Sequence, residues 1–259
     1  MSFGGSLVRP EATGFGAVYY VEAVMKHEND DIKGKSVVVS GFGNVAWGIC
    51  KKLAELGAKA VTLSGPDGYI YDPEGISTDE KVAFLLELRG SGKNICAPYA
   101  EKFPEAKFVA GKKPWGVCQD FDVKVDLFIP CAMQNDVHMA DAENIVASGC
   151  KFYCEGANMP TTNEALVYLM DKMTAVGPAK AANAGGVACS CIEMGQNAGH
   201  TVYQHEDVYT QLHQIMRNIY NACAGAGEKY YGDKNALVQG ANIAGFEKVA
   251  EAMMAQGLV

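Results

Sequence analysis

The stretch "VVVSGFGNVAWG", residues 37–48, decides the fold. Its first part belongs to the apolar segment "SVVVS", residues 36–40, which predicts a short strand covered on both faces. Glycines follow at once, and residues 44–56 then carry apolar side chains at helical spacing. A buried strand that leads through glycines into an amphipathic helix is typical of a βαβ unit.

The glycine turn itself fits the pattern of a dinucleotide-binding loop. Gly41 permits a sharp turn, Gly43 lets the backbone approach a pyrophosphate, and Ala46 allows close packing of helix on sheet. The helix begins at Asn44 and Val45, where free amides and the positive end of the helix dipole favour phosphate. Glycine-rich turns without a ligand are common, so the pattern alone leaves a purely structural turn open.

The acid that usually binds the adenosine ribose is missing from the end of the second predicted strand, residues 59–64. The chain continues there as Gly65-Pro66-Asp67-Gly68. Asp67 either reaches the ribose hydroxyls or is a turn aspartate before a glycine. The sequence leaves both roles open.

Strand and helix patterns alternate through most of the chain. We expect a helix over 10–28, further buried strands over 107–110, 125–130, 151–156 and 173–178, helices between them over 78–90, 140–148 and 163–173, and C-terminal helices over 189–198, 206–230 and 243–256. The predicted fold class is therefore α/β, a doubly wound, Rossmann-type, mostly parallel sheet with a C-terminal helical segment. We expect a dinucleotide-binding domain over 1–200 and a helical segment over 201–259 that packs on it.

Composition narrows the possible partners. The 259 residues carry 30 acidic and 22 basic side chains, a formal net charge of −8. This charge opposes binding to phosphate backbones and anionic membranes, so we expect no nucleic-acid and no membrane partner. No apolar run approaches the roughly 18 residues of a membrane span, and the N-terminus has no signal-peptide pattern. We therefore expect a cytoplasmic protein.

The nine cysteines do not form a metal-binding pattern. Cys150 and Cys154 form one close pair and Cys189 and Cys191 another, but no second pair or histidine follows at zinc spacing. We expect reduced, mostly buried thiols and no metal site.

Several longer stretches are specific to one family. They are "SLVRPEATGFG" (6–16), "SGFGNVA" (40–46), "GKKPW" (111–115), "PCAMQNDV" (130–137), "EGANMPTTNEA" (155–165), "GPAKAANAGGV" (177–187) and "GANIAGFEKVAEAM" (240–253). Together they resemble the hexameric glutamate dehydrogenases, and the resemblance covers only the family's C-terminal, coenzyme-binding part. The family's catalytic lysine and aspartate belong to a substrate domain without a counterpart here. We therefore expect an isolated second domain with no catalytic residue of its own.

The resemblance implies a role for each matching residue. Thr13 and Asn158 would line the nicotinamide, Gly41, Phe42, Gly43, Asn44 and Val45 the pyrophosphate, Ala132, Met133 and Gln134 the ribose side of the groove, and Pro66 and Asp67 the adenosine ribose. Val187 and Ser190 would face the substrate, with Ser190 bonding its distal carboxylate. Without the resemblance, Thr13 reads as a helix cap, Asn158 as a turn residue and Ser190 as a helix-interior hydroxyl.

At two positions near these sites, the sequence differs from the residue that is usual in the family. Met133 replaces a frequent threonine and removes a hydroxyl contact, and Cys191 replaces a frequent glycine after Ser190.

The resemblance implies oxidation of L-glutamate to 2-oxoglutarate and ammonium with a nicotinamide dinucleotide, in a homohexamer when the family's protein is complete. We expect NAD rather than NADP, because Gly65-Pro66-Asp67-Gly68 holds no basic or hydroxyl side chain for a 2′-phosphate and Phe42 adds none. Ser64, Lys112 or Lys113 could still supply a donor from nearby. A leucine- or phenylalanine-type dehydrogenase and a non-catalytic nucleotide-binding module remain as alternatives.

Overall fold

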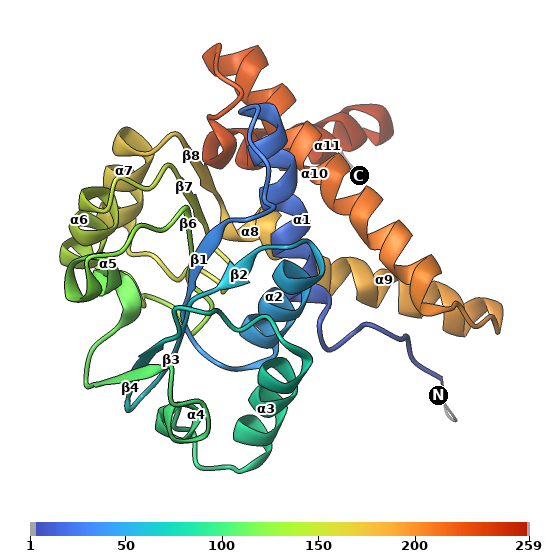
Figure 1. Ribbon diagram of the computed structural model, residues 1–259. Helices are drawn as coiled ribbons and strands as arrows, with labels where there is room; N and C mark the ends of the chain where they lie inside the picture. Colours follow the sequence, from blue (N-terminus) through green and yellow to red (C-terminus); the bar gives the residue numbers. More distant parts are fainter. Residues whose placement is uncertain (1–3, 258–259) are drawn as a thin grey trace.

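The computed structural model describes residues 4–257, so the outer limits predicted for the two domains, at 1 and 259, lie outside the described residues. Its centre is a five-stranded parallel sheet (Figure 1). The strands lie in the order β2 (Lys59–Ala60), β1 (Ser36–Val39), β6 (Leu127–Ile129), β7 (Phe152–Cys154) and β8 (Ala175–Gly177). The chain winds in opposite directions from β1 and from β6, which confirms the predicted doubly wound α/β fold.

Both faces of this sheet are buried, as its apolar strands predict. Val37 and Val39 point into one core and Val38 into the other, and β6 and β7 alternate in the same way. Helices α1 (Ala12–His27) and α2 (Asn44–Glu55) cover the first face. The 3-10 turn η1 (Pro114–Gly116) and helices α5 (Val117–Phe121), α6 (Met139–Ala147) and α7 (Asn163–Lys172) cover the second (Figure 1).

A small antiparallel sheet was not predicted. It consists of β3 (Thr62–Gly65), β4 (Gly68–Tyr71) and β5 (Lys107–Ala110), flanked by α3 (Asp79–Gly90) and α4 (Ala97–Lys102) (Figure 1). The predicted strand 59–64 splits at Val61, and its second half leaves the parallel sheet to form a hairpin. The strand predicted at 107–110 forms, but its predicted burial is wrong, because it lies at the edge of the small sheet with both its end residues exposed.

The C-terminal part is helical, with α8 (Ala179–Ala182), α9 (Gly185–Gly199), α10 (His205–Tyr231) and α11 (Leu237–Gln256). Helix α10 packs along α1 through aromatic pairs, Phe15 with Tyr209 at 5.4 Å and Tyr20 with Tyr220 at 5.8 Å between ring centroids. Helix α9 begins at Gly185, four residues earlier than predicted, and Gly185 packs directly on the backbone of α1.

All nine cysteines are free of disulfides in the structure, and all except the exposed Cys191 are buried, which confirms the predicted burial. Within residues 4–257, no group of three or more His, Cys, Asp or Glu side chains could hold a metal ion. No helix in the same range has the length and apolar character needed to cross a membrane.

Candidate functional site

Two adjoining cavities lie along the edge of the parallel sheet at which its strands end. The first, the glycine-turn cavity, has a volume of about 750 Å³ and lies beside Gly41, Phe42 and Gly43. The second, the Ser190 cavity, has a volume of about 530 Å³. Cys131 and Ala132, which follow β6, line both cavities. The two therefore form one groove across the point where the strand order reverses, which is where doubly wound folds bind ligands.

Gly41 and Gly43 differ in backbone conformation and in what a side chain at each position would contact. Gly41 has a φ of +78°, and a Cβ there would lie 3.0 Å from the Cα of Ala132. Its N–H donates a 2.8 Å hydrogen bond to the Oγ of Ser64 on β3. Gly43 has a negative φ, and a Cβ there would meet no protein atom within 4 Å. The fold thus requires Gly41, whereas Gly43 leaves open space in the cavity.

Ser40, at the end of β1, holds the turn against the loop after β6. Its buried hydroxyl donates to the Oδ2 of Asp136 at 2.9 Å and accepts from the N–H groups of Cys131 at 3.0 Å and Ala132 at 3.2 Å. Ser40 was not among the predicted site residues, because its partners lie more than 90 positions away in the sequence.

The segment expected at the adenosine ribose is the turn of the β3–β4 hairpin. Pro66 lines the glycine-turn cavity. The carboxylate of Asp67 instead accepts hydrogen bonds from the N–H groups of Cys96 at 3.0 Å and Ala97 at 2.9 Å, where α4 begins. This geometry favours the turn role over ribose binding for Asp67, because its oxygens satisfy free amides of another helix.

Three basic side chains line the glycine-turn cavity, although the local sequence offered none. They are Arg89, Lys112 and Lys113. Lys113 lies 3.2 Å from the Oδ1 of Asp136, and Lys112 lies 2.7 Å from the Oδ1 of Asp120. The hydrogen bond from Lys112 holds the pKa of Asp120 below its ordinary value.

The Ser190 cavity collects polar side chains from four parts of the chain. Its lining includes the predicted residues Thr13, Val45, Ala132, Asn158, Val187 and Ser190, together with Arg9, Lys180 and Asn183. Asn183 donates a 2.6 Å hydrogen bond to the Oδ1 of Asn158. Arg9 and Lys180 are cations, and no Asp or Glu lines the cavity within the described part of the chain. The cavity therefore favours an anionic ligand.

Close helix packing brings these residues together. A Cβ on Gly186 would lie 2.3 Å from the Oγ1 of Thr13, so α9 approaches α1 at van der Waals distance. Arg9 precedes α1 and follows Val8, whose φ of +72° is rare for a β-branched residue. Arg9 was not among the predicted site residues, because the residue pattern gives no sign of this backbone turn.

Glu155 joins two segments whose next residues, Gly156 and Lys180, line the Ser190 cavity. Its buried carboxylate accepts a 2.9 Å hydrogen bond from the N–H of Ala179 and so joins the end of β7 to the start of α8. Burial raises the pKa of Glu155 above its ordinary value, although hydrogen bonds from Thr161 and Ala179 oppose this shift.

Most predicted residues thus lie at the groove. Asn44, Asp67 and Gln134 line neither cavity, and Asn44 instead accepts a hydrogen bond from Arg89 through its side-chain oxygen. The individual roles of these residues stay predictions.

Comparison with known proteins gives consistent matches. Residues 4–257 match the family model described as Glutamate/Leucine/Phenylalanine/Valine dehydrogenase. The NAD-specific glutamate dehydrogenase of Clostridium symbiosum is 60% identical over 258 residues, which are 99% of this chain and 56% of that protein. The NADP-specific glutamate dehydrogenase of Haemophilus influenzae is 45% identical, over 100% of this chain and 56% of its own length.

A solved structure of a glutamate dehydrogenase has a TM-score of 0.94 and 60% identity, and the match covers 100% of this chain and 56% of that one. The chain spans about half the length of the curated relatives it matches.

Proposed function

Because the chain belongs to the Glutamate/Leucine/Phenylalanine/Valine dehydrogenase family, we propose that it is the coenzyme-binding part of an NAD-dependent glutamate dehydrogenase. The observation that carries this proposal is the groove from the glycine turn to Ser190, with the start of α2 at one end and Arg9 and Lys180 beside Ser190 at the other. The reaction is the conversion of L-glutamate, NAD and water to 2-oxoglutarate, ammonium and NADH.

The residues of the groove suit a dinucleotide. The space in front of Gly43 and the free amides at the start of α2 provide a place for a pyrophosphate without a charged side chain. Thr13 and Asn158 lie beside the second cavity and would hold the nicotinamide end. When bound, the nicotinamide supplies the hydride acceptor, and the protein supplies orientation and electrostatics.

A dicarboxylate substrate is supported by the polar wall of the Ser190 cavity. The Nε of Arg9 donates a 2.9 Å hydrogen bond to the Oγ of Ser190, and that hydroxyl donates to the carbonyl of Gly186 at 3.2 Å. A guanidinium beside a hydroxyl is a donor set for a carboxylate once the Ser190 hydroxyl turns from the Gly186 carbonyl toward the ligand. A pocket for leucine or phenylalanine would instead place an apolar side chain there, so this wall favours glutamate.

NAD is favoured by the lack of free donors at the hairpin turn. Pro66 has no N–H, and none of the four turn residues, 65–68, carries a basic or hydroxyl side chain. The two cavity lysines are held by Asp120 and Asp136. Relatives with either coenzyme preference occur, so the family alone does not decide the choice.

Titration calorimetry on this chain tests the proposal. We expect NAD to bind more tightly than NADP at equal ionic strength. We also expect no formation of NADH when L-glutamate is added, since the chain carries no catalytic lysine segment. If neither dinucleotide binds, the glycine turn has only a structural role. If NADP binds as tightly as NAD, the assignment of NAD is wrong. Turnover of glutamate by the pure chain would refute the division of labour proposed here.

A further inference from the structure

We propose that Arg89 binds the pyrophosphate of the dinucleotide, an inference that rests on the proposed function. Arg89 lies in the last turn of α3 and lines the glycine-turn cavity. Its guanidinium donates a hydrogen bond to the side-chain oxygen of Asn44, the first residue of α2. The guanidinium therefore lies beside the helix N-terminus at which the phosphates of a dinucleotide belong.

The charge balance of the cavity singles out Arg89 among its three cations. Lys112 and Lys113 are each paired with a carboxylate, Asp120 and Asp136 respectively. Within residues 4–257, Arg89 forms no ion pair, and its contact with Asn44 is to a neutral amide oxygen. A phosphate can replace that amide as acceptor without breaking an ion pair.

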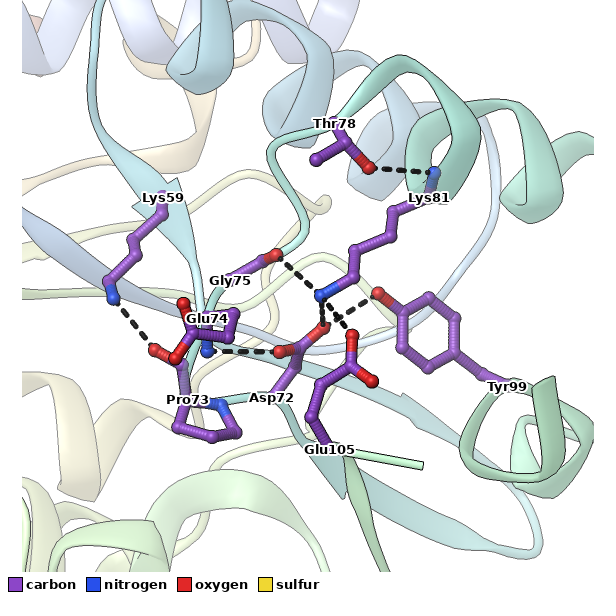
Figure 2. Close-up of polar contacts among 9 residues, drawn as sticks. All are labelled: Lys59, Asp72, Pro73, Glu74, Gly75, Thr78, Lys81, Tyr99 and Glu105. Atoms are coloured by element: carbon purple, nitrogen blue, oxygen red, sulfur yellow. Dashed lines mark hydrogen bonds and ion pairs between the residues drawn. The ribbon is translucent and has the colours of Figure 1, made fainter. Parts of the chain in front are cut away.

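The position of Arg89 depends on a buried anchor at the other end of α3. Thr78 caps this helix, and the ammonium of Lys81 lies 2.7 Å from the Oδ2 of Asp72 and 2.9 Å from the Oε1 of Glu105 (Figure 2). Asp72 also accepts a 2.9 Å hydrogen bond from the hydroxyl of Tyr99. The anchor holds the start of α3 against the small sheet and so directs its end toward the glycine turn.

The geometry favours the pyrophosphate over a 2′-phosphate. A 2′-phosphate would lie at the hairpin turn beside Pro66, whereas the partner of Arg89 is Asn44 at the glycine turn. The planar guanidinium can donate two parallel hydrogen bonds to phosphate oxygens, which a lysine cannot do. Both NAD and NADP carry the pyrophosphate, so Arg89 contributes to affinity without selecting between them.

The test compares Arg89→Gln with the unchanged chain by calorimetric titration of NAD, NADP, ADP and adenosine. We expect the three pyrophosphate ligands to bind roughly ten- to a hundredfold more weakly, as for loss of a charge-assisted hydrogen bond, and adenosine to be unaffected. Arg217→Gln, at an exposed arginine on α10 that lines neither groove cavity, is the matched control and should bind all four ligands normally. Circular dichroism and the melting temperature establish that each variant is folded.

The outcomes are distinct. Unchanged affinity of a folded Arg89→Gln variant for NAD overturns the assignment, and a loss confined to NADP moves Arg89 to the 2′-phosphate and overturns it too. Equal weakening of adenosine would show that Arg89 only shapes the cavity. If the unchanged chain binds none of these ligands, the proposed function itself fails.

Discussion

Arg9 and Ser190 are 181 positions apart, yet the Nε of Arg9 donates a 2.9 Å hydrogen bond to the Oγ of Ser190. This bond joins the segment before α1 to the middle of α9 and leaves the remaining donors of the guanidinium for the cavity. Both residues line the Ser190 cavity, where the distal carboxylate of the proposed substrate would bind.

Replacement of Ser190 by alanine should weaken the use of glutamate in the full-length protein. The loss of a charge-assisted hydrogen bond predicts a fall in kcat/KM of roughly ten- to a hundredfold. Cys191→Ala, at the neighbouring exposed position on the same helix, is the control and should retain the wild-type value. Unchanged kinetics for Ser190→Ala would show that its hydroxyl only bonds Arg9 and Gly186.

The glycine turn provides a matched pair of variants that separates folding from binding. Gly41→Ala places a side chain at a φ of +78° and against Ala132, so we expect a loss of at least about 1 kcal/mol in the free energy of unfolding. Gly43→Ala meets no protein atom, so its stability should be close to that of the wild type while NAD binds at least tenfold more weakly. Chemical denaturation and calorimetry measure the two effects. Normal NAD affinity in Gly43→Ala would place the pyrophosphate elsewhere.

The buried Lys81–Asp72 pair should contribute strongly to stability. Lys81→Met leaves the fully buried carboxylate of Asp72 without its ammonium partner, which predicts a loss of about 3–5 kcal/mol in the free energy of unfolding. Tyr99→Phe removes only one hydrogen bond to the same carboxylate and should cost about 1 kcal/mol. Urea denaturation followed by circular dichroism tests this order. Equal, small losses in both variants would contradict the role of the ion pair.

The raised pKa of Glu155 predicts how the free energy of unfolding depends on pH. Burial raises its pKa above the ordinary 4.5, so the folded state binds this proton more tightly than the unfolded state. The stability that this group contributes is therefore complete below 4.5 and is lost as the pH rises through the folded-state pKa.

Glu155→Gln keeps an acceptor for the N–H of Ala179 but cannot ionise. Its free energy of unfolding relative to wild type should therefore increase as the pH rises from 4.5 through the folded-state pKa of Glu155. A constant difference over this range would show that Glu155 titrates alike in the folded and unfolded chain.

The fold followed from the sequence because its evidence is local. The apolar run Val37–Val39, the glycines after it and the helical spacing from Asn44 onward each depend on neighbouring residues, and the structure places β1 and α2 within a residue of the predicted limits. The alternation of such units was sufficient to predict a doubly wound sheet. The small antiparallel sheet escaped prediction because β5 pairs with β4 across 35 intervening residues, 72–106, and is only partly buried.

The site was decided partly by sequence and partly by tertiary structure. The glycine pattern at Gly41 and Gly43 indicated a ligand-binding turn from neighbouring residues alone, whereas the roles expected of Thr13 and Ser190 came only from the family resemblance. The direction of the Asp67 carboxylate toward α4, and the arrival of Arg9 and Arg89 at the groove, depend on how distant helices pack. Hydrogen bonds such as these connect side chains from separate elements, so their partners exist only after the sheet and helices have assembled.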